Sequence, residues 1–185
     1  MRFSASASLT TLLSLAGAVA AQSPTTTAAG SSATLEPGYS FIRAVEDPNF
    51  HKYLQSEVLE TASDAVLGEP ENAAQFQITD GQLIQNAGGT PLYAVVEPPA
   101  GEDAKKLKVT WAEEPDTLGA FAFTGDTVEW SSPDVTRPQN NAWLVCEDED
   151  GNKDVYINLG PYSYETPEGC ADETIHGYTG STATP

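Results

Sequence analysis

The sequence predicts an all-β protein with a single compact antiparallel β-barrel or trefoil-like domain; a β-sandwich is the alternative. The first observation behind this prediction is a hairpin pattern over residues 75–85. Polar and apolar residues alternate there on both sides of the pair Asp80-Gly81, which tolerates the positive φ angles of a tight β-turn. The second observation is a clean alternation of apolar and polar residues over 106–111, as expected for a half-buried strand.

A faint internal repeat is the third observation. The pattern of residues 76–83 recurs in similar form over residues 121–128, again with a turn that contains glycine. Two hairpins of similar build explain the repeat, and a trefoil or related barrel made of repeated strand units is consistent with it.

The remaining expected strands are short and are separated by residues that favour turns, chiefly Gly, Pro, Asp and Asn. They lie at residues 40–45, 91–97, 121–124, 128–130, 143–147, 155–159 and 174–178.

Residues 47–60 carry an ambiguous pattern. The pair Asp47-Pro48 resembles a helix start, and Phe50, Leu54 and Val58 follow at helical spacing, so the local pattern slightly favours a helix. Two short strands with a turn before residue 62 are the alternative.

The two ends of the chain are expected to lie outside the folded domain. Residues 1–21 combine a positive start, a short apolar run and small residues at a cleavage site, which predicts a secretory signal peptide. Residues 22–37 are rich in Ser, Thr, Ala and Gly and predict a flexible leader. The all-β domain is expected over residues 38–178, with a disordered tail at residues 179–185.

The charge balance limits the kinds of partner. The chain has 27 acidic residues against 8 Lys and Arg, with a formal net charge of −19. Such a surface repels phosphate backbones and anionic membranes, so we expect neither nucleic acid nor membrane as a partner.

Cys146 and Cys170 are the two cysteines of the sequence. In an oxidising compartment an isolated pair is most simply a disulfide bond, which would stabilise the fold by about 3 kcal/mol in the chain-entropy model. The alternative is a nucleophilic thiol, but no Cys-His catalytic pattern surrounds Cys146.

No catalytic, metal or cofactor site is predicted. The acidic run over 148–154 lacks the glycine and the final glutamate of a calcium loop, so a solvated hairpin turn is the better interpretation. Glu129 is one of many acidic residues and does not identify a glycosidase. His51 and His176 are too few, and too far apart in sequence, for a zinc motif.

Aromatic residues are the other candidates for ligand contact. Trp111 and Trp143 occupy positions on the core-facing side of predicted strands, so we expect them to pack in the interior. Tyr162, Tyr164 and Tyr178 are expected in loops, where they could contact a ligand.

Four motifs occur in a fixed order along the chain. They are an opening strand at Phe41-Ile42-Arg43-Ala44-Val45, a central block at 76–83, a later block at 119–130, and a closing cysteine pair at Cys146 and Cys170. This order resembles the fungal cell-wall protein PhiA family, which includes secreted allergenic IgE-binding proteins and a related elicitor of plant hypersensitive responses.

The resemblance implies a strand, and not a helix, in the region 50–58. It also implies a secreted, non-enzymatic protein of the cell wall and extracellular space, linked to the development of spore-bearing cells and recognised by host immune systems. The family supplies no catalytic residue.

We therefore expect a secreted fungal cell-wall-associated structural or interaction protein without catalytic activity. Its possible partners are wall polysaccharides, wall proteins and host immune factors. An effector or elicitor recognised by a host, or a small glycan-active enzyme, are the alternatives.

Overall fold

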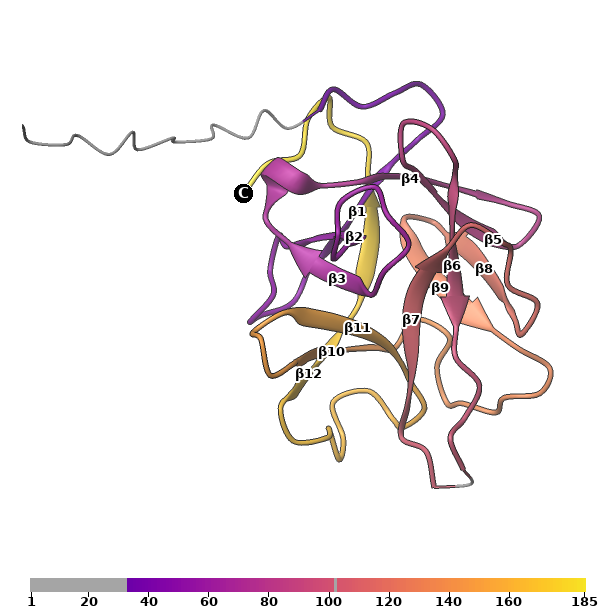
Figure 1. Cartoon of the computed structure of the whole chain (residues 1–185). Coiled ribbons are helices and arrows are strands. Elements are labelled where there is room, and N and C mark those ends of the chain that lie inside the picture. The colour runs from indigo at the N-terminus through magenta and orange to yellow at the C-terminus, as the bar shows by residue number, and fades with distance from the viewer. Residues whose placement is uncertain (1–32, 102) are drawn as a thin grey trace, which may run out of the picture.

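β-strands account for nearly all the regular structure of the chain. The computed structural model describes residues 33–101 and 103–185 (Figure 1). One short 3-10 helix, η1 (Pro70–Asn72), accompanies the strands. The strands are β1 (Phe41–Ala44), β2 (Tyr53–Ser56), β3 (Ala65–Gly68), β4 (Gln75–Thr79), β5 (Gln82–Asn86), β6 (Leu92–Val96), β7 (Lys106–Ala112), β8 (Ala120–Thr124), β9 (Thr127–Ser131), β10 (Trp143–Glu147), β11 (Lys153–Asn158), β12 (Cys170–Glu173) and β13 (Ile175–Tyr178).

The strands form one antiparallel sheet that is nearly closed into a barrel. Its order is β4-β5-β6-β7-β11-β3-β2-β1-β13-β9-β8, and β10 pairs with both β11 and β12 beside this path. The all-β prediction and its barrel option are therefore confirmed.

The two hairpins that resemble each other in sequence lie at the two ends of this strand order and meet there. The amide of Phe121 in β8 donates a hydrogen bond to the carbonyl of Gly81, with 2.8 Å between the atoms. Ser40, just before β1, and Phe76 in β4 exchange two further backbone hydrogen bonds. Both unpaired edges of the sheet are thus partly covered, which protects them from pairing with other chains.

The first hairpin has the turn that its sequence predicts. Asp80 and Gly81 have φ angles of 52° and 79°, as a two-residue turn of the favoured mirror-image type requires. Gly125 has a φ angle of 66° in the second hairpin. The repeat in the sequence therefore reflects two similar hairpins.

A single main core fills the barrel, and the three tryptophans belong to it. The indole of Trp111 donates to the carbonyl of Gln55, and that of Trp143 to the carbonyl of Val128. The prediction that Trp111 and Trp143 pack in the interior is confirmed.

The prediction of a disordered tail at residues 179–185 is wrong. Ala183 is buried against Phe41 and Tyr53 in a second, smaller core. The hydroxyl of Tyr53 donates to the carbonyl of Thr184 and accepts a hydrogen bond from its amide. The polar composition of the tail hides this contact, because the partner residues lie far away in the sequence.

The end of the predicted leader also belongs to the domain. The amide of Leu35 donates to the carbonyl of Ser181, so the entering chain and the tail lie side by side. The domain therefore begins before residue 38. The predicted signal peptide and leader residues 22–32 lie outside the described residues.

The helix favoured by the local pattern of residues 47–60 is wrong. The chain turns at the cis bond between Asp47 and Pro48 and then enters β2. Phe50 and Val58, which would have faced the core from a helix, are more than half exposed. Pairing of β2 with β1 and β3 overrides the helical spacing. No described helix is long and apolar enough to cross a membrane.

The contact between the two hairpins can be tested at Gly81. A Cβ atom there would lie 3.0 Å from the Cβ of Ala120 and at a positive φ, whereas one at Gly125 would have the positive φ but no atom within 4 Å. We expect Gly81→Ala to lower the free energy of unfolding by about 2 kcal/mol and Gly125→Ala by about 1 kcal/mol. Urea titration measures both, and Ala120→Gly should remove the difference. Equal costs would show that the contact is unimportant.

Candidate functional site

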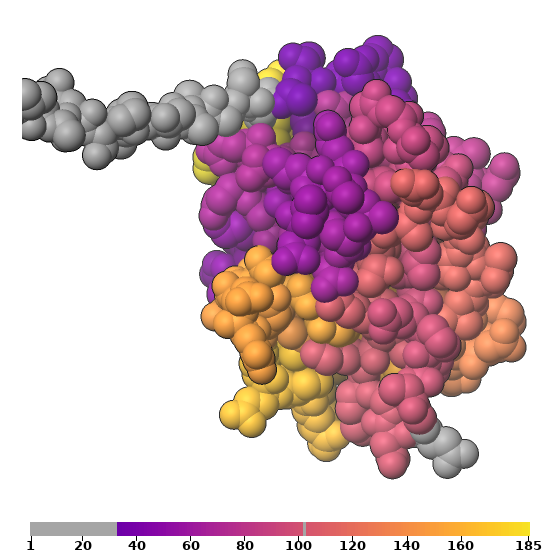
Figure 2. Space-filling model, viewed as in Figure 1, coloured from indigo at the N-terminus to yellow at the C-terminus, as the bar shows by residue number. Residues whose placement is uncertain are grey.

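A polar pocket opens where the entering chain, β2, η1 and β5 approach one another. It has a volume of about 620 Å³ and is lined by side chains from residues 33–36, 55–60, 71–75 and 85–88. In Figure 2 the indigo surface of residues 33–40 and the purple surface around residue 60 lie on the upper part of the near face. We call this hollow the amide pocket, because Gln55, Gln75 and Gln85 line it together with Asn72 and Asn86.

Ser56 and Gln85 form the floor of the amide pocket. The Nε2 of Gln85 donates to the Oγ of Ser56 at 3.1 Å. Gln85 is only 1% exposed, and its Oε1 has no hydrogen-bond partner among the described residues. A buried amide oxygen without a partner is unfavourable. This oxygen has almost no exposed surface of its own, so a ligand can donate to it once the Gln85 side chain turns toward the pocket.

The pleat of β5 explains why Gln85 points inward. Gln85 pairs with Phe76 of β4, and directly paired residues place their side chains on the same face of a sheet. Phe76 belongs to the main core, so Gln85 occupies a core-facing position at the end of the barrel.

Gln75 fixes the wall formed by the entering chain. Its Oε1 accepts a hydrogen bond from the amide of Glu36 at 2.7 Å, and its Nε2 donates to the carbonyl of Thr34 at 2.9 Å. The buried side chain of Gln75 thus binds one backbone amide and one backbone carbonyl of the segment that enters the domain. The wall is held in place by β4 itself.

The mouth of the pocket is acidic. Glu36, Glu60 and Glu71 line it from three separate segments, and we call them the rim glutamates. Leu59 adds an exposed apolar surface on the same side as Glu60. Amides, a hydroxyl and an apolar wall together suit a ligand that carries many hydroxyl groups on a partly apolar skeleton.

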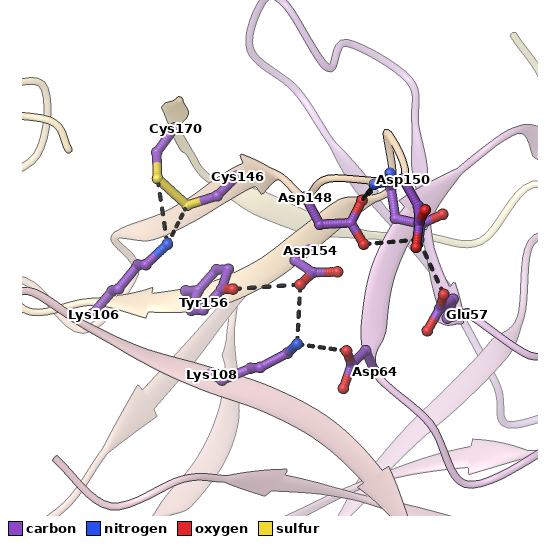
Figure 3. A network of polar contacts seen from close by, with 11 residues as sticks. Glu57, Asp64, Lys106, Lys108, Cys146, Asp148, Asp150, Asp154, Tyr156 and Cys170 are labelled. Atoms are coloured by element: carbon purple, nitrogen blue, oxygen red, sulfur yellow. Dashed lines mark hydrogen bonds and ion pairs between the residues drawn. A yellow bond between two sulfur atoms is a disulfide. The ribbon is translucent and has the colours of Figure 1, made fainter. Parts of the chain in front are cut away.

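A second polar cluster joins three strands on another part of the sheet (Figure 3). The Nζ of Lys108 lies 2.5 Å from a carboxylate oxygen of Asp64 and 3.0 Å from one of Asp154. Burial acts to lower the pKa of Lys108, but hydrogen bonds to the two carboxylates and their charges outweigh it and raise that pKa. Lys108 is therefore a permanent cation that bridges β7, β11 and the start of β3.

The predicted disulfide between Cys146 and Cys170 is confirmed, and it lies beside this cluster. It joins directly paired residues of β10 and β12. The Nζ of Lys106 lies 3.0 Å from the Sγ of Cys146 and 3.8 Å from the centre of the Tyr156 ring. Burial lowers the pKa of Lys106, although the charge of Asp154 opposes the effect.

The acidic run over 148–154 forms the hairpin turn between β10 and β11, as the sequence indicates. The carboxylate of Asp148 accepts hydrogen bonds from the amides of Asp150 and Asn152. The hydrogen bond from the Asn152 side chain and those from the turn amides lower the pKa of Asp148. Asp154, at the far end of the run, points instead to Lys108. Among the described residues, no group of three or more His, Cys, Asp or Glu is arranged to hold a metal ion.

The three tyrosines proposed for ligand contact do not form one site. Tyr162 and Tyr164 lie in the loop between β11 and β12, and Tyr164 borders a depression of about 50 Å³. Tyr178 is in β13, where its ring packs with Phe41 and Tyr53 and lies beneath the guanidinium of Arg43. The loop placement of Tyr178 is therefore wrong, whereas the strand expected at 174–178 is confirmed.

The other residues weighed in the sequence are also dispersed. Glu129 lies on β9, where its charge partly offsets the burial that lowers the pKa of Arg137 to about 10. His51 stacks on Phe50 in the turn before β2, whereas His176 lies on β13 beside Asp126.

Sequence reasoning missed two features, the amide pocket and the buried Glu173. The sequence feature that could have indicated the pocket is the alternation of side chains in β5, which places Gln85 on the same core-facing side as Leu83. Glu173 is fully buried, and its Oε1 accepts a hydrogen bond from Asn49 at 2.7 Å. Burial raises the pKa of Glu173 to about 7, although that hydrogen bond opposes the effect.

Fold and pocket together define an all-β protein with a nearly closed antiparallel barrel and an amide-lined pocket at one end of its core. A family model described as a domain of unknown function, DUF7907, matches residues 38–175, and the chain belongs to this family. No curated protein and no solved structure matches the chain.

The ion pairs of Lys108 predict a measurable loss of stability. We expect Lys108→Met to lower the free energy of unfolding by about 2–3 kcal/mol, because buried Asp154 then loses its ion-pair partner. Lys153→Met, which removes an ion pair with exposed Glu147, should cost less than about 1 kcal/mol. Adding Asp154→Asn to Lys108→Met should restore part of the loss in urea titrations. Similar costs for the two lysines would contradict the bridging role.

Buried Glu173 predicts a pH dependence of stability. Its folded-state pKa of about 7 is higher than that of an unfolded chain, about 4.3. Between these two pKa values, Glu173 is protonated in the folded state and ionised in the unfolded state. The free energy of unfolding therefore decreases as the pH rises through this range. The contribution of Glu173 to stability is smallest above about pH 7, where both states are ionised. We expect Glu173→Gln to be more stable than the parent protein by about 1–2 kcal/mol at about pH 8, with no advantage at about pH 4.

The control for this prediction is Glu168→Gln, the same substitution at an exposed position of the preceding loop. It measures the effect of the net charge alone. Thermal unfolding of the three proteins across this pH range provides the comparison. The raised pKa of Glu173 would be refuted if the parent protein became more stable relative to Glu173→Gln as the pH rises over this range.

Proposed function

We propose that this chain is a secreted, non-catalytic protein of the fungal cell wall that binds a wall polysaccharide in the amide pocket. The signal-peptide pattern of residues 1–21 supports secretion. The resemblance of the four sequence motifs to cell-wall proteins supports the location. The pocket supplies the means of attachment.

One observation carries the proposal, namely the unpartnered Oε1 of Gln85 at the floor of a pocket of about 620 Å³. Sugar hydroxyl groups donate and accept hydrogen bonds, so a sugar would satisfy this acceptor while it also contacts the amides of Asn72 and Asn86. The apolar wall at Leu59 suits the C–H face of a sugar ring. The acidic mouth disfavours nucleic acids and other polyanions.

Binding to isolated polysaccharides tests the proposal. Purified protein is mixed with insoluble β-glucan, chitin and deacetylated chitin, and the fraction that sediments is measured. We expect retention on at least one of them, reduced about tenfold or more in affinity by Gln85→Leu, since a lost hydrogen bond and an unmatched sugar hydroxyl together cost at least about 1.4 kcal/mol.

Gln77→Leu is the matched control, because it makes the same change on β4 at a position outside the pocket. Circular dichroism confirms that both variants fold. No retention of the parent protein on any wall polysaccharide would overturn the proposal, as would equal retention of the two variants.

A further inference from the structure

We infer that the amide pocket selects a polysaccharide whose sugars carry free, protonated amino groups, as in deacetylated chitin. This inference rests on the proposed function and specifies the class of ligand. It is argued from the charges around the pocket and from the buried amide at its floor.

The lining of the pocket is exclusively neutral or acidic. Among the described residues, it includes the rim glutamates Glu36, Glu60 and Glu71 and contains no Lys, Arg or His. Among the residues that the structure describes, none of the three carboxylates takes part in an ion pair. All three residues are exposed, so their charges are available to a ligand that enters.

The rim glutamates come from three separate segments. Gln75 holds the backbone amide of Glu36, and Glu71 belongs to η1. The carboxylate oxygens of Glu60 lie 3.7 Å from the position that a Cβ atom of Gly88 would take, so Glu60 reaches the turn after β5. Among the described residues, no three carboxylates are grouped to hold one metal ion, so these three charges suit several positive groups better than a single ion.

The floor supplies a second, independent requirement. The unpartnered Oε1 of buried Gln85 needs a hydrogen-bond donor, which either a hydroxyl or an ammonium group provides. A simple metal ion or a small amine would satisfy the rim without filling the pocket. An amino sugar satisfies both, because hydroxyl groups contact the amide floor while ammonium groups lie among the rim glutamates.

The test compares three soluble oligosaccharides of equal length by isothermal titration calorimetry. They are a glucosamine oligomer, its N-acetylated form and a β-glucan oligomer, all in a mildly acidic buffer that keeps the amines protonated. We expect the glucosamine oligomer to bind at least about tenfold more tightly than the other two, with an affinity that falls as salt is added.

Two charge variants separate the pocket from the general acidity of the protein. The rim variant carries Glu36→Gln, Glu60→Gln and Glu71→Gln. The control variant carries Glu113→Gln, Glu114→Gln and Glu149→Gln, which remove equal charge from exposed positions outside the pocket. We expect the rim variant to bind the glucosamine oligomer about tenfold more weakly and the control variant to bind nearly as well as the parent protein.

The outcomes distinguish this inference from the proposed function. If none of the oligomers binds and no polysaccharide retains the protein, the proposed function fails, and this inference fails with it. If a neutral oligomer binds as tightly as the glucosamine oligomer, or if the two variants weaken binding equally, the glycan site stands and the selection of amino sugars is refuted.

Discussion

The ion pairs of Lys108 connect the two parts of the barrel. On one side β7 continues through β6 and β5 to the first hairpin, and on the other β3 continues through β2 to β1. β11 lies between them, and its pairing with β3 is a single residue pair, Asp154 with Val66. Lys108 of β7 bridges Asp154 of β11 and Asp64 before β3, so side-chain charges reinforce a junction of the sheet that has only one backbone residue pair.

The amide pocket depends on this connection. Its floor consists of Ser56 from β2 and Gln85 from β5, which belong to the two parts that β11 and Lys108 join. The hydrogen bond from Trp111 of β7 to the carbonyl of Gln55 adds a second link between the same parts. A change in the angle between them would separate Ser56 from Gln85. The rigidity of the pocket therefore depends on the junction that β11 and Lys108 form between the two parts. No residue of the Lys108 cluster itself lines the pocket.

The sequence alone predicts those features that short-range patterns determine. The first hairpin was predictable because Asp80-Gly81 fixes its turn, and the disulfide because the chain has a single pair of cysteines. The docked tail and the pocket were not predictable, because they require residues far apart in the chain to meet. Tyr53 and Thr184 are an example, since neither has a local pattern that indicates the other. The helical spacing over 47–60 was misleading for a different reason, because the pairing of β2 with its sequence neighbours β1 and β3 outweighs the local pattern.

Two buried glutamines of the amide pocket are not explained by packing alone. Within the part of the chain that the structure describes, the Oε1 atoms of Gln55 and Gln85 both lack partners, and apolar side chains at these positions would avoid that cost. The surroundings of Gln55 are nevertheless shaped to hold its amide, because a Cβ atom on Gly68 would lie only 2.5 Å from it. Gln85 likewise takes a core-facing position of β5 that an aliphatic residue would fill well. Unsatisfied buried polar groups in a well-packed fold call for an explanation, and a ligand that supplies the missing donor at the pocket floor provides one for Gln85.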